Sequence, residues 1–150
     1  MIVALFTGSR EWKDKAAVVA AFEHAEQVGI HYVVTGDQRG LDRLAYEVAR
    51  ERGHGQTVVP VHAFWNEDGR GAGNVRNRQM INTALVLASS LSWIHWARTR
   101  TEPNLRPYAE FVHGYAFPMP GSIGTWNCCD DMKAAHINYD LRGTSPRRGA

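Results

Sequence analysis

The sequence predicts an α/β fold, a Rossmann-like three-layer sandwich with a mainly parallel sheet of about five strands. Three observations predict it. Short apolar runs typical of buried strands alternate with longer segments in which apolar residues recur at helical spacing. Glycines separate most of these segments, as is common where helices end and turns begin. The length of 150 residues, with 44% hydrophobic residues, suits one domain.

The first strand is predicted at residues 2–6, a short run that is wholly apolar. A turn follows it, and Asp14 then offers an N-cap for a helix that continues to Val28. Gly29 is placed to end this helix as a C-cap. Residues 31–35 predict the second strand, which is expected to end at Gly36.

A second helix is predicted at residues 41–52, because its apolar residues share one helical face. These residues are Leu44, Ala45, Val48 and Ala49. The β-branched residues at positions 57–62 predict the third strand. A glycine-rich stretch at residues 68–73 then leads into a third helix, predicted at residues 74–87.

The region that follows has weaker signals. Residues 92–96 predict a fourth strand, on which Trp93 and Trp96 are expected to belong to the core. Residues 97–117 contain prolines and many polar side chains and are predicted to form a long irregular excursion or lid.

The last part of the chain returns to a regular pattern. A second glycine-rich turn at residues 120–125 precedes a helix predicted at residues 126–136. A short strand at residues 137–141 is expected to complete a single domain that spans residues 1–141. Residues 142–150, rich in Pro, Gly and Arg, are predicted to be a flexible tail.

Composition excludes several classes of protein. There are 17 Lys and Arg against 15 Asp and Glu, and a net charge of +2 argues against nucleic acid as the main partner. No apolar run reaches about 18 residues, so no membrane span is expected, and the N-terminus lacks signal-peptide features. The adjacent Cys128 and Cys129 predict no disulfide framework, and the histidines lack metal-ligand spacing. These features predict a cytoplasmic protein that requires neither metal nor cofactor.

The unusual residues gather on one type of connection. Residues 7–10, 36–40 and 63–65 each follow a predicted strand, and residues 120–125 precede the last helix. Strand-to-helix connections of a parallel sheet all lie at the carboxyl edge, where ligands bind at a topological switch point. The opposite connections carry little besides a C-cap glycine. The sequence therefore predicts a ligand site at the carboxyl edge.

The chemistry of these connections is suited to an anion. A helix N-terminus presents unpaired N–H groups, and glycines let the backbone approach a phosphate closely. Gly121, Ser122, Gly124 and Thr125 precede or begin the last predicted helix, and Arg10 follows the first strand. Neither stretch is a GxxxxGK[ST] or GxGxxG motif, so kinase and ordinary dinucleotide-binding classes are unsupported.

Other residues on these connections have two open interpretations. Asp42 either caps its helix or accepts a ribose hydroxyl, and capping is favoured by a small margin. Arg76 and Asn77 face a ligand or hold the preceding loop, while Trp12 and Trp65 could stack on a base. The candidate ligand-binding residues are Gly8, Ser9, Arg10, Trp12, Gly36, Asp37, Arg39, Asp42, Trp65, Arg76, Asn77, Gly121, Ser122, Gly124 and Thr125.

The same residues resemble a known superfamily. The segments Phe-Thr-Gly-Ser-Arg-Glu-Trp at 6–12 and Val-Thr-Gly-Asp-Gln-Arg-Gly-Leu-Asp-Arg at 34–43, followed by Trp65, Arg76 and Asn77, resemble the YspA-like branch of the SLOG superfamily. That superfamily groups Smf/DprA proteins with Lonely-guy phosphoribohydrolases. The resemblance spans about residues 2–88, and Gly124–Thr125 continues it. It implies a Rossmann-like nucleotide-binding protein of a bacterium or a phage-infected cell, and it is compatible with a homodimer or higher homo-oligomer.

The sequence departs from the patterns of this superfamily at two places. The branch usually shows Gly-Gly-Ala-Arg-Gly-Ala-Asp, whereas Asp37, Gln38 and Leu41 replace small residues here. Residues 120–127 resemble the Pro-Gly-Gly-x-Gly-Thr motif of the Lonely-guy enzymes, but Cys128 stands where their catalytic Glu is expected. Asp131 is about one helical turn further on, so it is a weak candidate for a displaced carboxylate.

Three functions are therefore expected, in decreasing order of support. The first is a sensor or binding module for a nucleotide or nucleotide-derived ligand, either ADP-ribose/NAD-like or a nucleoside phosphate. The second is a phosphoribohydrolase that cleaves the N-glycosidic bond of nucleotides. The third is DprA-like binding of single-stranded DNA through basic residues, namely Arg70, Arg76, Arg98, Arg100 and those of the tail.

Overall fold

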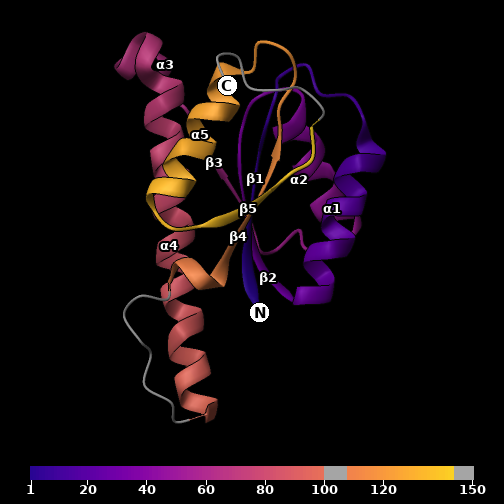
Figure 1. Ribbon diagram of the computed structural model, residues 1–150, viewed down its shortest axis with the longest axis vertical. Helices are drawn as coiled ribbons and strands as arrows, with labels where there is room; N and C mark the ends of the chain where they lie inside the picture. Colours follow the sequence, from indigo (N-terminus) through magenta and orange to yellow (C-terminus); the bar gives the residue numbers. More distant parts are fainter. Residues whose placement is uncertain (100–107, 144–150) are drawn as a thin grey trace.

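A parallel sheet forms the centre of the protein (Figure 1). The structure, a computed structural model, describes residues 1–99 and 108–143. The sheet has five strands in the order β3-β2-β1-β4-β5, and every neighbouring pair is parallel. The strands are β1 (Ile2–Gly8), β2 (Ile30–Gly36), β3 (Val58–Val61), β4 (Val112–Phe117) and β5 (Asn138–Leu141).

Helices cover both faces of the sheet, which confirms the predicted three-layer α/β fold (Figure 1). On one face, α1 (Lys15–Val28) and α2 (Leu41–Glu51) pack on a core in which Phe6 stacks against Phe22 and Tyr115 at ring-centroid distances of 4.5 and 5.0 Å. On the other face lie α4 (Ala72–Thr99) and α5 (Ile123–Ala134). Three short elements, α3 (Trp65–Asp68) and the 3-10 turns η1 (Gly69–Gly71) and η2 (Ala109–Phe111), connect the layers.

The ends of α1 confirm the predicted caps. The Asp14 carboxylate accepts a hydrogen bond from the Ala17 N–H at 3.1 Å, so it satisfies a donor that the first helical turn leaves unpaired. Gly29 has a φ of +103°, and its N–H donates to the Ala25 carbonyl at 2.9 Å. This left-handed conformation favours glycine and reverses the chain into β2.

The prediction for residues 74–96 was wrong in one respect. The strand expected at 92–96 does not form, because α4 continues without a break from Ala72 to Thr99. The buried residues of α4 keep helical spacing beyond position 87, since Ala88, Leu91 and Ser92 continue the buried stripe. Trp93 is 59% exposed, so it does not belong to the core as expected.

The excursion expected at residues 97–117 is also corrected. It contains the end of α4, the turn η2 and the central strand β4, while residues 100–107 lie outside the described part of the chain. Strand β4 was not predicted because His113 and Gly114 interrupt its apolar pattern. Gly114 is required there because a Cβ would lie against the Met132 sulfur and 2.8 Å from the Cβ of Tyr139.

The C-terminal elements differ from the expectation in their bounds. Helix α5 begins at Ile123 rather than at 126, which brings Gly124 and Thr125 into its first turn. Strand β5 begins at Asn138. Within the expected flexible tail, the Arg142 N–H donates to the Ala116 carbonyl at 2.7 Å, and residues 144–150 lie outside the described part.

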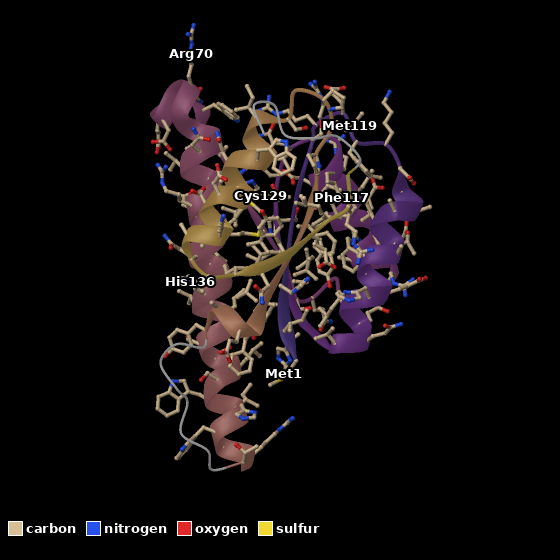
Figure 2. The ribbon with its side chains drawn as sticks, viewed as in Figure 1. Met1, Arg70, Phe117, Met119, Cys129 and His136 are labelled. Atoms are coloured by element: carbon tan, nitrogen blue, oxygen red, sulfur yellow. The ribbon has the colours of Figure 1, made fainter. Side chains whose placement is uncertain are left out.

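The strand order creates a switch point beside β1. The chain moves outward on one side through β2 and β3, and it then crosses to the other side to form β4 and β5. Figure 2 shows Met1 at one end of the sheet and Arg70 and Met119 at the other. Because Met1 precedes β1 and all strands are parallel, Arg70 and Met119 mark the carboxyl edge. The connections after β1 and β4 therefore leave the sheet side by side, with a crevice between them.

Candidate functional site

A pocket of about 390 Å³ occupies this crevice. It lies where the connections after β1, β2 and β4 meet the start of α4. Most of the candidate residues line it, and these are Gly8, Ser9, Arg10, Asp42, Trp65, Arg76, Asn77, Gly121, Ser122, Gly124 and Thr125. The volume falls within the range of small-molecule sites, so the pocket can hold a ligand of nucleotide size.

The N-terminus of α5 forms one wall of the pocket. Its N-cap residue Ser122 makes no capping bond to the helix, because its hydroxyl accepts a hydrogen bond from the Met119 N–H at 2.8 Å. Within the described residues, the backbone N–H groups of Gly124 and Thr125 have no acceptor. Two unpaired donors at the positive end of a helix dipole favour an anion at this wall.

The connection after β1 forms a second wall. Ser9 shapes this turn, because its hydroxyl accepts from the Glu11 N–H at 3.0 Å. The Arg10 guanidinium lies over the Trp65 ring at 5.4 Å from its centroid. Trp65 is 41% exposed, so a stacking face and a cation meet at the mouth of the pocket.

A buried acid and a buried arginine lie together at the pocket floor. Asp42 is 5% exposed, and its Oδ2 accepts from the Gln38 N–H at 3.1 Å. Arg76 reaches this carboxylate from α4, with Nη1 3.5 Å from Oδ2 of Asp42 and 3.6 Å from Oδ1 of Asp37. Gly36 makes room for the pair, because a Cβ there would overlap both side chains.

One charged donor at the pocket floor lacks a hydrogen-bond acceptor among the described residues. Nη1 of Arg76 is buried, and no acceptor in the described part of the chain completes a hydrogen bond to it. Burial raises the pKa of Asp42 to about 6, although the positive charge of Arg76 opposes the rise. Asp37 adds to the rise through charge repulsion. Asp42 is therefore more readily protonated than an ordinary aspartate.

Asn77 connects the floor to the anion wall. Its side-chain amide donates to the Gly124 carbonyl at 3.1 Å, and its Oδ1 accepts from Nε of Arg76 at 3.2 Å. The Asn77 side chain itself is buried, at 3% exposure. A continuous polar chain thus runs from Asp42 through Arg76 and Asn77 to the start of α5.

We expect Asn77→Ala to lower the free energy of unfolding by about 1–3 kcal/mol. The change removes the amide that donates to the Gly124 carbonyl and leaves the Arg76 Nε–H without this acceptor. Urea denaturation followed by tryptophan fluorescence measures the loss. Asn74→Ala is the control, because Asn74 is exposed and its side chain accepts a hydrogen bond from the side-chain amide of Asn127 at 3.2 Å. Equal losses in the two variants would contradict the role of Asn77 as a buried connector.

Four candidate residues do not line the pocket. The Trp12 ring packs edge-on against Phe117 at 5.1 Å, so Trp12 belongs to the core rather than to a stacking site. Arg39 pairs with Glu11 at 2.7 Å on the surface. Gly36 and Asp37 both lie next to Arg76 instead. Gly36 leaves space for the Arg76 side chain, and the Asp37 carboxylate lies 3.6 Å from its Nη1.

The favoured interpretation of Asp42 as a helix cap was wrong. The N-cap of α2 is Gly40, and Asp42 lies inside the first turn. Its carboxylate accepts from Gln38, which precedes the helix, and lies 3.5 Å from the Thr35 hydroxyl. The carboxylate thus holds the connection after β2 and lines the pocket.

Helix α5 contributes no carboxylate to the pocket among the described residues. Cys128, at the position of the catalytic Glu in the Lonely-guy motif, is fully buried, and burial raises the pKa of its thiol to about 12. Asp131 does not line the pocket, and the charges that influence its pKa are those of Arg78 and Asp130. A displaced carboxylate at position 131 therefore lies outside the pocket.

Several pocket residues were missed in the sequence. Glu11 and Gln38 lie on connections already selected, next to residues that were chosen. Met80 lies one helical turn beyond Arg76 and lines the same wall. Helical spacing from Arg76 and Asn77 would have found Met80, once α4 was placed at the edge of the pocket.

The fold and the pocket define an α/β protein with a small-molecule pocket at the switch point of a parallel sheet. The chain is similar to the Gene 61 protein of Mycobacterium phage D29, with 29% identity over 148 residues. The similarity covers 95% of this chain and 97% of the phage protein. No protein-family model matches the chain, and no solved structure matches it.

Two further findings concern the described residues. In that part of the chain, no helix combines the length and the apolar character needed to cross a bilayer. Nor do the described His, Cys, Asp and Glu side chains form a group of three or more that could hold a metal ion.

Proposed function

We propose that this protein binds a phosphate-containing nucleotide or nucleotide derivative, of the ADP-ribose or nucleoside phosphate type, in the pocket at the carboxyl edge of the sheet. One observation carries the proposal. Gly124 and Thr125, whose backbone N–H groups have no acceptor among the described residues, line the same pocket as Arg10 and Arg76. Backbone donors at a helix N-terminus together with arginine side chains are a typical arrangement for phosphate.

The residues at the mouth of the pocket are suited to the base of a nucleotide. The exposed ring of Trp65 offers an aromatic surface on which a base can stack, and Arg10 already lies against one side of this ring. A ligand that joins a phosphate to a flat heterocycle would use both features. Free phosphate would use only the wall at α5.

The order of these features along the chain supports membership in the SLOG superfamily. The Thr-Gly-Ser-Arg segment, the Gly-Asp-Gln-Arg-Gly-Leu-Asp segment and the Gly-Thr pair all belong to the connections around one pocket. We propose binding rather than N-glycosidic hydrolysis, because neither Cys128 nor Asp131 brings a carboxylate to the pocket.

Equilibrium binding of ADP-ribose and AMP, measured by calorimetry, tests the proposal. We expect Arg10→Ala to weaken binding by about tenfold to a hundredfold, because it removes charge-assisted hydrogen bonds to phosphate. Arg43→Ala is the control, since Arg43 is exposed on α2 and does not line the pocket. Equal affinity in all three proteins would show that the site is misplaced.

A second substitution tests the wall at α5 without disturbing the fold. A Cβ at Gly124 would meet no atom within 4 Å, so Gly124→Val is expected to fold normally and to crowd the phosphate. We expect its affinity to fall by at least about tenfold, with unchanged thermal stability. Gly71→Val is the control, because Gly71 is equally open but does not line the pocket.

The same experiments separate the alternatives. Release of free base from AMP or NAD during incubation would support the hydrolase. Binding of a single-stranded oligonucleotide that weakens steeply with salt, without binding of AMP or ADP-ribose, would support the DNA-binding alternative.

A further inference from the structure

We propose that the Asp42 side chain carries a proton whenever the phosphate of the ligand binds beside Arg76, so that this residue couples anion binding to pH. This inference rests on the proposed function, since it concerns the same pocket. It goes beyond that function by assigning a proton to a named side chain and by coupling ligand binding to pH.

The geometry of the floor is the basis of the proposal. Asp42 lines the pocket, yet its side chain is only 7% exposed, so water screens its charge poorly. Its Oδ2 accepts a hydrogen bond from the Gln38 N–H at 3.1 Å and lies 3.5 Å from Nη1 of Arg76, and its Oδ1 accepts a long hydrogen bond of 3.5 Å from the Thr35 hydroxyl. A buried carboxylate that accepts so few hydrogen bonds is costly to keep ionised.

The surrounding charges do not neutralise two acids. Arg76 from α4 is the cation that faces Asp42, and it is shared with Asp37 from the connection after β2. His62, after β3, faces Asp37 at 2.7 Å rather than Asp42. On α5, the Cys128 thiol is neutral, because burial raises its pKa to about 12.

An anionic ligand adds a further negative charge to the two carboxylates that share Arg76. A phosphate at the unpaired N–H groups of α5 shares the pocket with Asp42, and Asn77 and Arg76 connect the two positions. An ionised Asp42 would repel the phosphate in a poorly screened space, whereas the protonated form would leave the full charge of Arg76 for the ligand. Burial already places the pKa of Asp42 at about 6, so the proton is available close to neutral pH.

The sign of the pH dependence follows from this. Below a pH of about 6, free Asp42 already carries the proton and affinity is constant. Above it, each binding event must take up a proton, so affinity falls as pH rises, by up to about tenfold per pH unit. We therefore expect ADP-ribose to bind at least about tenfold more weakly at pH 8 than at pH 6.

ADP-ribose is the suitable probe, because its diphosphate has no group that titrates in this range. Calorimetry of the unmodified protein in two buffers with different heats of ionisation counts the protons taken up. We expect uptake that approaches one proton per ligand at pH 8 and vanishes well below pH 6. This measurement needs no variant, so it does not depend on how a substitution folds.

Asp42→Asn supplies the second test, because the amide imitates the protonated acid. We expect this variant to bind ADP-ribose at pH 8 about as tightly as the unmodified protein does at pH 6, with no pH dependence. His62→Gln is the control for the neighbouring histidine, which does not line the pocket, and should retain the pH dependence.

The possible failures are distinguishable. Binding of ADP-ribose that is independent of pH and takes up no proton would overturn the role of Asp42 and leave the proposed function intact. A pH dependence that persists in Asp42→Asn and disappears in His62→Gln would assign the proton elsewhere and overturn it as well. Absence of binding at every pH would overturn both proposals.

Discussion

Replacing Gly40 with alanine is expected to lower the free energy of unfolding by more than about 3 kcal/mol. Gly40 has φ +75° and ψ −126°, a conformation that only glycine adopts readily. A Cβ there would also overlap the backbone of Arg10 and lie 2.5 Å from the Ser9 carbonyl oxygen. That backbone cannot move away easily, because the Ser9 carbonyl accepts hydrogen bonds from Trp12 and Leu41 at 3.2 and 3.1 Å.

Gly69 provides a matched control for this prediction. Its φ of +60° and ψ of −135° place it in the same conformational region, but a Cβ there would meet nothing within 4 Å. Gly69→Ala should therefore cost only the conformational strain, about 1–3 kcal/mol. Urea denaturation of both variants separates strain from crowding. Similar losses would show that the connections after β1 and β2 do not pack tightly through Gly40.

The same contact affects the pocket. Gly40 holds the connection after β2 against the connection after β1, and these two segments carry Asp42 and Arg10. In the folded fraction of Gly40→Ala, the two walls would be forced apart. We expect its affinity for ADP-ribose to fall as well, whereas Gly69→Ala should bind normally.

Local signals made much of the fold predictable. The cap residues Asp14 and Gly29 act within their own helix, so the sequence contains all the information that determines their roles. The same holds for the connections at the carboxyl edge, because a short apolar strand followed by glycine and polar residues is a local pattern. The placement of the pocket followed from these connections and from the rule for parallel sheets.

Contacts between distant segments explain what could not be predicted. Strand β4 is central, but its Gly114 is understood only from Met132 on α5 and Tyr139 on β5. Asp42 looked like a cap because it begins a helix, whereas its environment is set by Arg76 on α4, far along the chain. A pattern of residue types along the chain does not show which distant residues will come into contact.

Leu91→Ala is expected to lower the free energy of unfolding by about 2–5 kcal/mol, the usual cost of removing a buried leucine side chain. Leu91 is fully buried under the sheet, in the cluster that contains Leu5 and Met132. Trp93→Ala is expected to cost less than about 1.5 kcal/mol, because Trp93 is 59% exposed and its ring contacts that of Trp96.

This pair of variants distinguishes a helix from a strand at these positions. Residues two apart point to the same face of a strand, so Leu91 and Trp93 would share one face if residues 91–96 paired with the sheet. In a helix they are about 200° apart, and only one of them can face the core. A large loss for Leu91→Ala with a small loss for Trp93→Ala is therefore the signature of α4 continuing to Thr99. Losses of similar size would favour a strand, and α4 would then end before its last turns.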